Sequence, residues 1–379
     1  MAACGSQPTM QTVSPIATPR WEVDVPSVLY VSGYEEGHPA CVVKAVSIDG
    51  GEPIAVTTNP PPFDCWRPKF SPNGKKLVFA NHEDGHLYVM DLDGSNLVKV
   101  SDSIVEVAWS PDSSRLAYYA RVSDVQQGRL AVVDADGGNL HFISSRHISI
   151  CGGCDFVFEI SWSPDGEWIY APSNNENFIT ANIFKVDGTE YRQLSEKQIS
   201  METANAWLMT KEWPVLPAAA WSPDSQRLAL PVDLTGSGCG QLDILSLEGE
   251  RKSLTIEMVR KLGKTDIASS CFWDNFYWSP DGQSILAYGH PTGNFEEGEI
   301  IVVNMDEESI DSLGYWLGHP GMSVWSPDGS QLVFSSLSAS DSSKNYILIV
   351  MRVKPDPEPY RMLTDSVKDY PGSLLWLNP

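Results

Sequence analysis

The sequence predicts an all-β chain folded as a seven-bladed β-propeller, with four-stranded antiparallel blades and a ring closed by pairing of the N- and C-terminal strands. Three observations predict this fold. An aromatic-Ser-Pro motif occurs six times, short β-rich runs follow each copy, and incomplete blade sequences stand at the two ends. A six-bladed ring is the alternative count.

The repeated motif combines the end of a strand with a tight turn. Its aromatic residue is followed by Ser-Pro, then by Asp or Asn, and then by Gly or Ser. The six copies start at Phe70, Trp109, Trp162, Trp221, Trp278 and Trp325. Ser-Pro-Asp-Gly fits a type I turn because proline presets φ at the second position and aspartate is tolerated at the third. The aromatic residue therefore ends a first strand, after which the chain reverses.

Three further strands complete each blade. Runs such as 77–79 and 116–118 follow the turns directly and are rich in β-forming residues. A third strand such as 87–90 follows a variable loop, and Asp-Gly pairs such as 93–94 suit the hairpin that leads to a fourth strand. Each unit is therefore one antiparallel sheet.

The two chain ends supply the last blade. Residues 28–31, 42–46 and 54–56 are interpreted as second, third and fourth strands without a first strand, and 374–379 resemble a lone first strand. Pairing of the two ends would close the ring and remove both exposed sheet edges. The sequence thus predicts seven blades.

A flexible tether over 1–22 is expected to precede a single propeller domain over 23–379. Small residues stand before Cys4 and a polar stretch follows it, a pattern that resembles the lipobox of bacterial lipoproteins after removal of the signal peptide. Cys4 is therefore the predicted lipidation site, and an accidental cysteine near a disordered end is the alternative. No run of 18 apolar residues occurs, so the expected membrane link is this lipid.

The charge balance is strongly acidic. With 26 basic and 49 acidic residues, the formal net charge is −23, which repels nucleic-acid phosphates and anionic lipid headgroups. Nucleic acid is therefore excluded as a partner class.

Six further cysteines fit the disulfides of an exported protein. Cys41 and Cys239 each precede a third strand, and Cys65 and Cys271 each lead into a first strand, so both kinds of segment emerge on one face of a propeller. We predict the pairs Cys41–Cys65 and Cys239–Cys271. The remaining two are interpreted as a short structural disulfide, with a redox dithiol or half of a zinc site as alternatives; they are Cys151 and Cys154.

That face, which we call the loop face, also gathers aromatic residues. Five tryptophans outside the repeated motif precede first strands, with Arg67 and Asp274 nearby. They are Trp66, Trp207, Trp213, Trp273 and Trp316. Aromatic rings beside polar groups suit stacking on sugars or gripping a peptide, so these residues form the predicted ligand-binding site. The alternative is that they wedge between blades.

Familiar signatures of catalysis are missing from the sequence. It contains no G-x-S-x-G nucleophile elbow and no phosphate-binding glycine loop, so we assign no catalytic residue and expect no cofactor. Five histidines map to the loop face, where imidazoles could bind a divalent ion; they are His38, His82, His86, His290 and His319. No spacing singles out ligands among them.

The six motifs resemble the TolB-type propeller repeat family over about residues 66–336. The resemblance implies the fold, but the repeat occurs in envelope scaffolds, sugar-cleaving lyases and peptidase propellers. TolB itself has six blades and a separate N-terminal domain, whereas a short tether stands here. We expect an exported scaffold, lipid-anchored to a bacterial membrane, that binds an envelope protein or glycan without catalysis. A metal-dependent polysaccharide lyase, similar to seven-bladed oligogalacturonate lyases, is the alternative.

Overall fold

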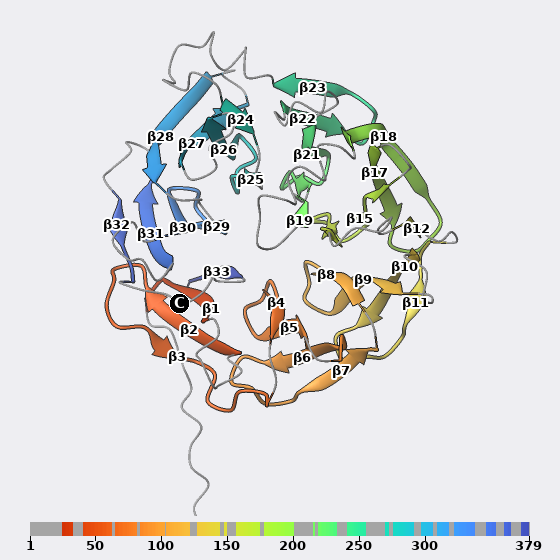
Figure 1. Ribbon diagram of the computed structural model, residues 1–379, viewed down its shortest axis with the longest axis horizontal. Helices are drawn as coiled ribbons and strands as arrows, with labels where there is room; N and C mark the ends of the chain where they lie inside the picture. The colour runs from red at the N-terminus through yellow and green to blue at the C-terminus, as the bar shows by residue number, and fades with distance from the viewer. Residues whose placement is uncertain are drawn as a thin grey trace, which may run out of the picture.

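In the computed structural model, the described residues form a closed ring of antiparallel sheets around a central axis (Figure 1). They are residues 25–32, 41–62, 65–81, 84–102, 104–121, 127–144, 148–149, 157–174, 178–200, 215–216, 219–232, 241–254, 270–272, 276–291, 297–305, 309–317, 322–337, 346–353, 360–364 and 373–378. Every regular element among them is a β-strand. None of these residues belongs to a helix long and apolar enough to span a bilayer.

Each repeated motif starts one blade, and the described part of the chain contains seven blades, which confirms the predicted count. Blade 1 contains β4 (Trp66–Phe70), β5 (Lys76–Ala80), β6 (Leu87–Asp91) and β7 (Val98–Ser101). Blade 2 contains β8 (Ile104–Trp109), β9 (Arg115–Arg121), β10 (Gln127–Asp134) and β11 (His141–Phe142), with β12 (Ile148–Ser149) also on β10. Blade 3 contains β14 (Ser161–Trp162), β15 (Trp168–Tyr170), β17 (Phe178–Lys185) and β18 (Tyr191–Ser200), with β16 (Ser173–Asn174) also on β17.

The next three blades repeat this order. Blade 4 contains β20 (Ala220–Trp221), β21 (Arg227–Val232), β22 (Gln241–Ser246) and β23 (Arg251–Leu254). Blade 5 contains β24 (Ser270–Phe272) and β25 (Tyr277–Trp278) on β26 (Ser284–Pro291), then β27 (Glu297–Asn304) and β28 (Ser309–Leu317). Blade 6 contains β29 (Ser323–Trp325), β30 (Gln331–Leu337), β31 (Tyr346–Arg352) and β32 (Arg361–Met362). A parallel pair, β13 (Val157–Phe158) and β19 (Val215–Leu216), joins the segments before the first strands of blades 3 and 4.

Blade 7 is built from both ends of the chain, as the sequence predicts. Its strand order is β3 (Ile54–Ala55), β2 (Val42–Ser47), β1 (Ser27–Ser32) and β33 (Leu374–Leu377). The innermost strand β33 pairs antiparallel with β1 from Ser27↔Leu377 to Tyr30↔Leu374. This ladder closes the ring (Figure 1).

The Ser-Pro-Asp-Gly segments are tight turns. In blade 3 the N–H of Gly166 donates to the carbonyl of Ser163 at 2.9 Å, and the Ser163 hydroxyl donates to the Asp165 carboxylate at 2.5 Å. The same hydroxyl accepts a hydrogen bond from the N–H of Trp168 at 2.9 Å. The motif therefore satisfies its own backbone at the reversal. These turns form the turn face, opposite the loop face from which the first strands begin.

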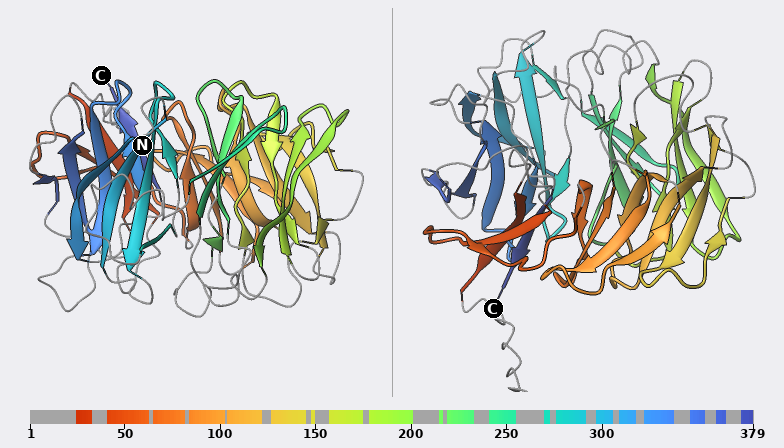
Figure 2. Two further views of the ribbon diagram at one scale, coloured as in Figure 1. Left: turned by 90° about the horizontal axis from the view of Figure 1, so that it is seen from above. Right: turned by 60° about the horizontal axis from the view of Figure 1, so that its bottom comes forward.

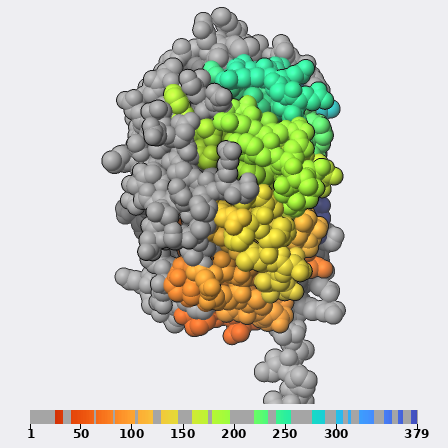
Figure 3. Space-filling model, turned by 90° about the vertical axis from the view of Figure 1, so that its right-hand side faces the viewer, coloured from red at the N-terminus to blue at the C-terminus, as the bar shows by residue number. Residues whose placement is uncertain are grey.

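The hydrophobic core lies between neighbouring blades. Between blades 3 and 4, Tyr170 and Ile183 pack with Leu228 and Leu230, and all four side chains are buried. Successive side chains of a strand point to opposite sides of its sheet, so each blade contributes to two such layers. Figure 2 shows the strands running between the two faces, and in Figure 3 the orange, yellow, green and teal segments of blades 1 to 4 follow one another.

The motif tryptophans also link each blade to the preceding one. The indole N–H of Trp278 in blade 5 donates to the backbone carbonyl of Ala220 in blade 4 at 3.0 Å. The acceptor is always the residue directly before the aromatic residue of the previous blade. Five such indole bonds occur in the described residues: Trp109 to Lys69, Trp162 to Ala108, Trp221 to Ser161, Trp278 to Ala220 and Trp325 to Tyr277.

Candidate functional site

The first strand of blade 1 bulges near the loop face. Its register on β5 shifts between Trp66↔Ala80 and Lys69↔Val78, so one extra residue stands on the β4 side. Arg67, inside the bulge, has a backbone φ of 51°, which residues other than glycine rarely adopt. A bulge redirects the side chains that it carries. Here it places Arg67 toward the neighbouring blade.

Arg67 contacts one residue of its own strand and one of blade 2. Its guanidinium carbon lies 4.5 Å from the centre of the half-buried Trp66 ring, a cation–π contact. Its Nη1 lies 2.9 Å from Oε2 of Glu106, which stands in a second bulge, between Ile104 and Val107 of β8. The two bulges therefore face each other across the blade 1/2 junction.

Lys69 extends this network to blade 3. Its Nζ donates to Oε1 of Glu106 and, at 3.2 Å, to Oε1 of Glu159, which stands just before β14. Burial alone lowers the pKa of Lys69, but Glu106 and Glu159 more than offset it and raise that pKa to about 12. Lys69 is therefore a cation at neutral pH.

The four charged side chains balance one another. Glu106 is only 3% exposed and contacts both Arg67 and Lys69, so its buried charge is compensated twice. Two carboxylates and two cations sum to zero. The network thus links the innermost strands of blades 1 and 2, β4 and β8, which lie on the same side of the ring axis (Figure 1), to the segment before β14 of blade 3.

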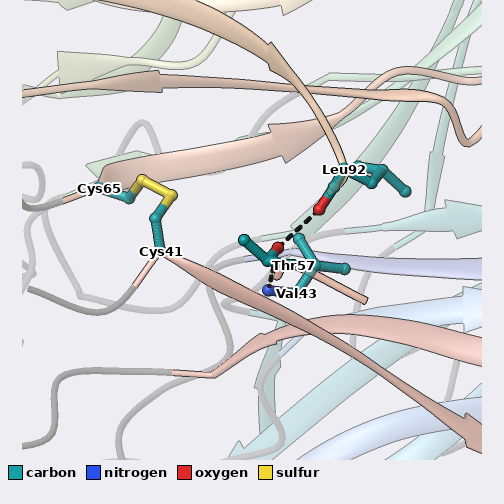
Figure 4. Close-up of a disulfide and its surroundings, with 5 residues drawn as sticks. All are labelled: Cys41, Val43, Thr57, Cys65 and Leu92. Carbon is teal, nitrogen blue, oxygen red and sulfur yellow. Dashed lines mark hydrogen bonds between the residues drawn. A yellow bond between two sulfur atoms is a disulfide. The ribbon is translucent and has the colours of Figure 1, made fainter. Parts of the chain in front are cut away.

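Next to this network, a disulfide joins blade 7 to blade 1. Cys41, directly before β2, is bonded to Cys65, directly before β4, with Cα atoms 5.2 Å apart (Figure 4). This confirms the predicted pair. Deeper in the same junction, the Thr57 hydroxyl donates to the carbonyl of Leu92 at 2.6 Å and accepts from the N–H of Val43 at 3.0 Å.

The structure brings together two of the predicted ligand-binding residues, Trp66 and Arg67. Trp316 lies in β28, but its side chain is outside the described residues, as is that of Cys271 in β24. Several other predicted residues lie outside the described residues altogether. They are Trp207, Trp213, Trp273, Asp274, the lipidation site Cys4, and Cys151, Cys154 and Cys239. The grouping of tryptophans and the other two cysteine pairs therefore stay predictions.

Of the five candidate histidines, the structure describes the side chain of His86. Its Nδ1 lies 3.0 Å from Oδ2 of Asp84, in the segment before the third strand of blade 1. His290 lies in β26 with its side chain outside the described residues, and His38, His82 and His319 lie outside them as well. Within the part of the chain that the structure describes, no group of three His, Cys, Asp or Glu side chains is placed to hold a metal ion.

Sequence reasoning missed the charged network around Arg67 and Lys69. Arg67, Glu106 and Glu159 each stand three residues before the aromatic residue of their motif, in blades 1, 2 and 3. Equivalent positions on neighbouring innermost strands lie side by side in a propeller. Opposite charges at this repeat position could therefore have predicted an ion pair between neighbouring blades.

Comparison with known proteins agrees with this architecture. A family model described as the TolB beta propeller domain matches residues 4–206, more than half of the chain. The chain belongs to the TolB beta propeller domain family. The search of curated proteins finds no match for this TolB-type propeller.

Solved structures share the fold at low sequence identity. An oligogalacturonate lyase in complex with manganese is 13% identical and has a TM-score of 0.51, covering 86% of this chain and 82% of its own. A prolyl endopeptidase structure is 10% identical, with a TM-score of 0.57 and coverages of 89% and 49%. TolB from Acinetobacter baumannii is 15% identical, with a TM-score of 0.48; the match covers 80% of this chain and 66% of that TolB. The lyase and endopeptidase likenesses, with TM-scores above 0.5, show the fold alone.

Proposed function

We propose that this TolB-type propeller is an exported, lipid-anchored scaffold of the bacterial cell envelope that binds a protein or glycan through its loop face, without catalysis. The observation that carries the proposal is the Cys41–Cys65 disulfide directly beside Trp66. It pins the segment that leads into β4, and a surface held rigid before binding loses less conformational entropy on binding. Disulfides are also typical of exported proteins.

The Trp66–Arg67 pair supplies the chemistry of the proposed surface. The guanidinium lies over the indole and is held by an ion pair with Glu106. A flat aromatic group beside a fixed polar group suits stacking on a sugar ring or gripping a peptide side chain. Trp66 and Arg67 are the proposed anchors, with Trp207, Trp213, Trp273, Asp274 and Trp316 as proposed neighbours on the loop face.

A matched pair of variants tests the binding surface. Ligands would first be found by pull-down from detergent-solubilised envelope and by a glycan array. Trp66→Ala should then weaken binding about fivefold or more, the effect of losing one anchor. Phe142→Ala is the control, because Arg129 lies 4.0 Å over that ring in the same kind of stack, but on the outer strand of blade 2. Equal affinity of the two variants for the ligand would contradict the proposal.

The lyase alternative and the lipid anchor have separate tests. Release of unsaturated products from polygalacturonate in the presence of Mn²⁺, followed by ultraviolet absorbance, would replace the scaffold proposal by the lyase. For the anchor, Cys4→Ser in the native precursor should release the protein from the membrane fraction. Unchanged membrane association would show that Cys4 does not carry the lipid.

A further inference from the structure

Blade 7 lacks the indole bond that links the other blades. The donor from blade 1 would be residue 70, but Phe70 has no ring N–H. On the other side, the indole of Trp376 donates to Oδ1 of Asn378 in its own segment at 3.2 Å rather than to blade 6. Neither junction of blade 7 therefore has the hydrogen bond described at the other five junctions.

The junction with blade 6 has a second weakness. Ser335 of β30 shares its side of the sheet with Val333, which packs with Tyr30 and Trp376 of blade 7. Its hydroxyl is buried and has no hydrogen-bond partner in the described residues. A buried donor without a partner destabilises the packed state relative to the solvated one. Opening of this junction would solvate that hydroxyl.

The junction of blade 7 with blade 1 has a covalent bond where the other junctions have the indole hydrogen bond. The disulfide closes a span of 24 residues between Cys41 of blade 7 and Cys65 of blade 1. Backbone bonds reinforce it, since the N–H of Asn59 donates to the carbonyl of Asp93 at 3.0 Å. Cys41 is fully buried and Cys65 is partly exposed, so an external thiolate reaches the sulfur of Cys65 first.

We propose that the Cys41–Cys65 disulfide is a redox latch that stands in for the missing indole bonds, and that its reduction by a dithiol lets blade 7 open while the other blades stay folded. A thiolate of the dithiol attacks Sγ of Cys65, and Cys41 leaves as a thiolate that takes up a proton. The second thiol of the reductant then displaces Cys65. The protein gains two electrons and two protons, and the reductant becomes a disulfide.

Hydrogen exchange with mass spectrometry on the full chain tests the latch. In a Cys41→Ser/Cys65→Ser variant, amides of β1, β2 and β33 should exchange on the order of a hundredfold faster, the loss expected for a cross-link of this span. Amides of β21 and β22 in blade 4 should change less than about twofold. Uniform acceleration over all blades, or none in blade 7, would overturn the proposal. If the variant does not fold, a Cys151→Ser/Cys154→Ser/Cys239→Ser/Cys271→Ser variant compared with and without dithiothreitol gives the readout, because reduction then breaks the Cys41–Cys65 bond alone of the three predicted disulfides.

Adding an indole donor at position 70 tests whether the disulfide compensates for the missing indole bond. Phe70→Trp in the double-serine background should slow exchange in blade 7 about fivefold, the worth of one hydrogen bond. Trp221→Phe, which removes the corresponding donor between blades 3 and 4, should speed exchange there and leave blade 7 unchanged. If neither substitution alters exchange at its junction, the indole bond is not what the disulfide replaces and the proposal fails.

Discussion

The hydroxyl of Ser225 accepts a hydrogen bond from the backbone N–H of Asp165 at 2.9 Å, which joins the turns of blades 3 and 4. Ser225 has φ of 62°, in the left-handed region that four equivalent turns occupy with glycine, namely Gly74, Gly166, Gly282 and Gly329. Ser113 repeats the arrangement toward the N–H of Asn73 at 3.0 Å. Serine at this position therefore has a strained backbone, but its hydroxyl forms a hydrogen bond to the neighbouring blade.

Ser225 should consequently respond differently to two small replacements. Ser225→Ala keeps the left-handed strain and loses the bond, so it should destabilise the protein by about 1 kcal/mol. Ser225→Gly loses the same bond but relieves strain of about 1 kcal/mol, so its stability should stay near that of the wild type. Thermal unfolding of the two variants side by side checks this; an alanine variant as stable as the glycine variant would contradict it.

Gly94 should be far less replaceable than another glycine of the same conformation. Gly94 and Gly249 have φ of 91° and 96°, but a Cβ on Gly94 would lie 1.8 Å from the carbonyl oxygen of Asn59, whereas Gly249 has nothing within 4 Å. Gly249→Ala should cost about 1 kcal/mol from backbone strain. Gly94→Ala should cost more than about 3 kcal/mol, because it forces blades 7 and 1 apart. Similar melting temperatures for the two variants would argue against this close contact.

The indole bond should be measurable by comparing two tryptophans. Trp278→Phe removes the donor to Ala220 in the preceding blade, and Trp376→Phe removes only a local bond to Asn378. Both variants lose the same volume, so the difference between them reports the bond between blades together with any weakening of the Arg227 stack on the Trp278 ring. We expect Trp278→Phe to be the less stable by about 0.5–1.5 kcal/mol in thermal unfolding. If Trp376→Phe were the less stable variant, the indole bond between blades would not be a source of stability.

The charged network predicts a stability difference that depends on alkaline pH. Lys69→Met should destabilise the protein by about 1–3 kcal/mol at neutral pH, since Glu106 then keeps only Arg67. The folded pKa of Lys69 is raised from 10.5 to about 12, so its contribution is complete below pH 10.5 and is lost as the pH rises through 12. Urea unfolding of both proteins between pH 7 and pH 12 should show the gap closing. A gap independent of pH would mean that the charge of Lys69 does not matter.

Removal of the last strand should open the ring. Leu374 and Trp376 pack toward blade 6, and Leu375 and Leu377 pack toward blade 1, so β33 contributes to both junctions of blade 7. A chain that ends before Ser373 loses these contacts and exposes the edge of β1. Its melting temperature should fall well below that of a chain with a deletion at the surface. Unchanged melting would show that another segment closes the ring.

The fold could be predicted from the sequence because its repeat is local. The turn at Ser163 satisfies its own hydrogen bonds, and the incomplete strand sets near Val28 and Trp376 can only complete each other. The same repeat logic located Cys41 and Cys65 on one face, and their disulfide is confirmed.

The candidate site was harder to predict, because its contacts cross between blades. Arg67 reaches Glu106 only through two bulges, and bulges leave no mark in a hydrophobic pattern. Lys69 joins residues 37 and 90 positions away, a grouping that exists only once the ring brings three innermost strands together. Strand pairs outside the blade repeat, such as β13 with β19, were likewise not predicted.

The indole bonds leave the side chain at the acceptor position open to change. Each bond ends on a backbone carbonyl, so any side chain can occupy the acceptor position, and the five acceptors here are Lys69, Ala108, Ser161, Ala220 and Tyr277. An ammonium, a methyl group, a hydroxyl and a phenol thus stand at equivalent places, and the same indole bond joins neighbouring blades in each case. Natural variation or protein design can change the side chain at this position one blade at a time while the indole bond is kept.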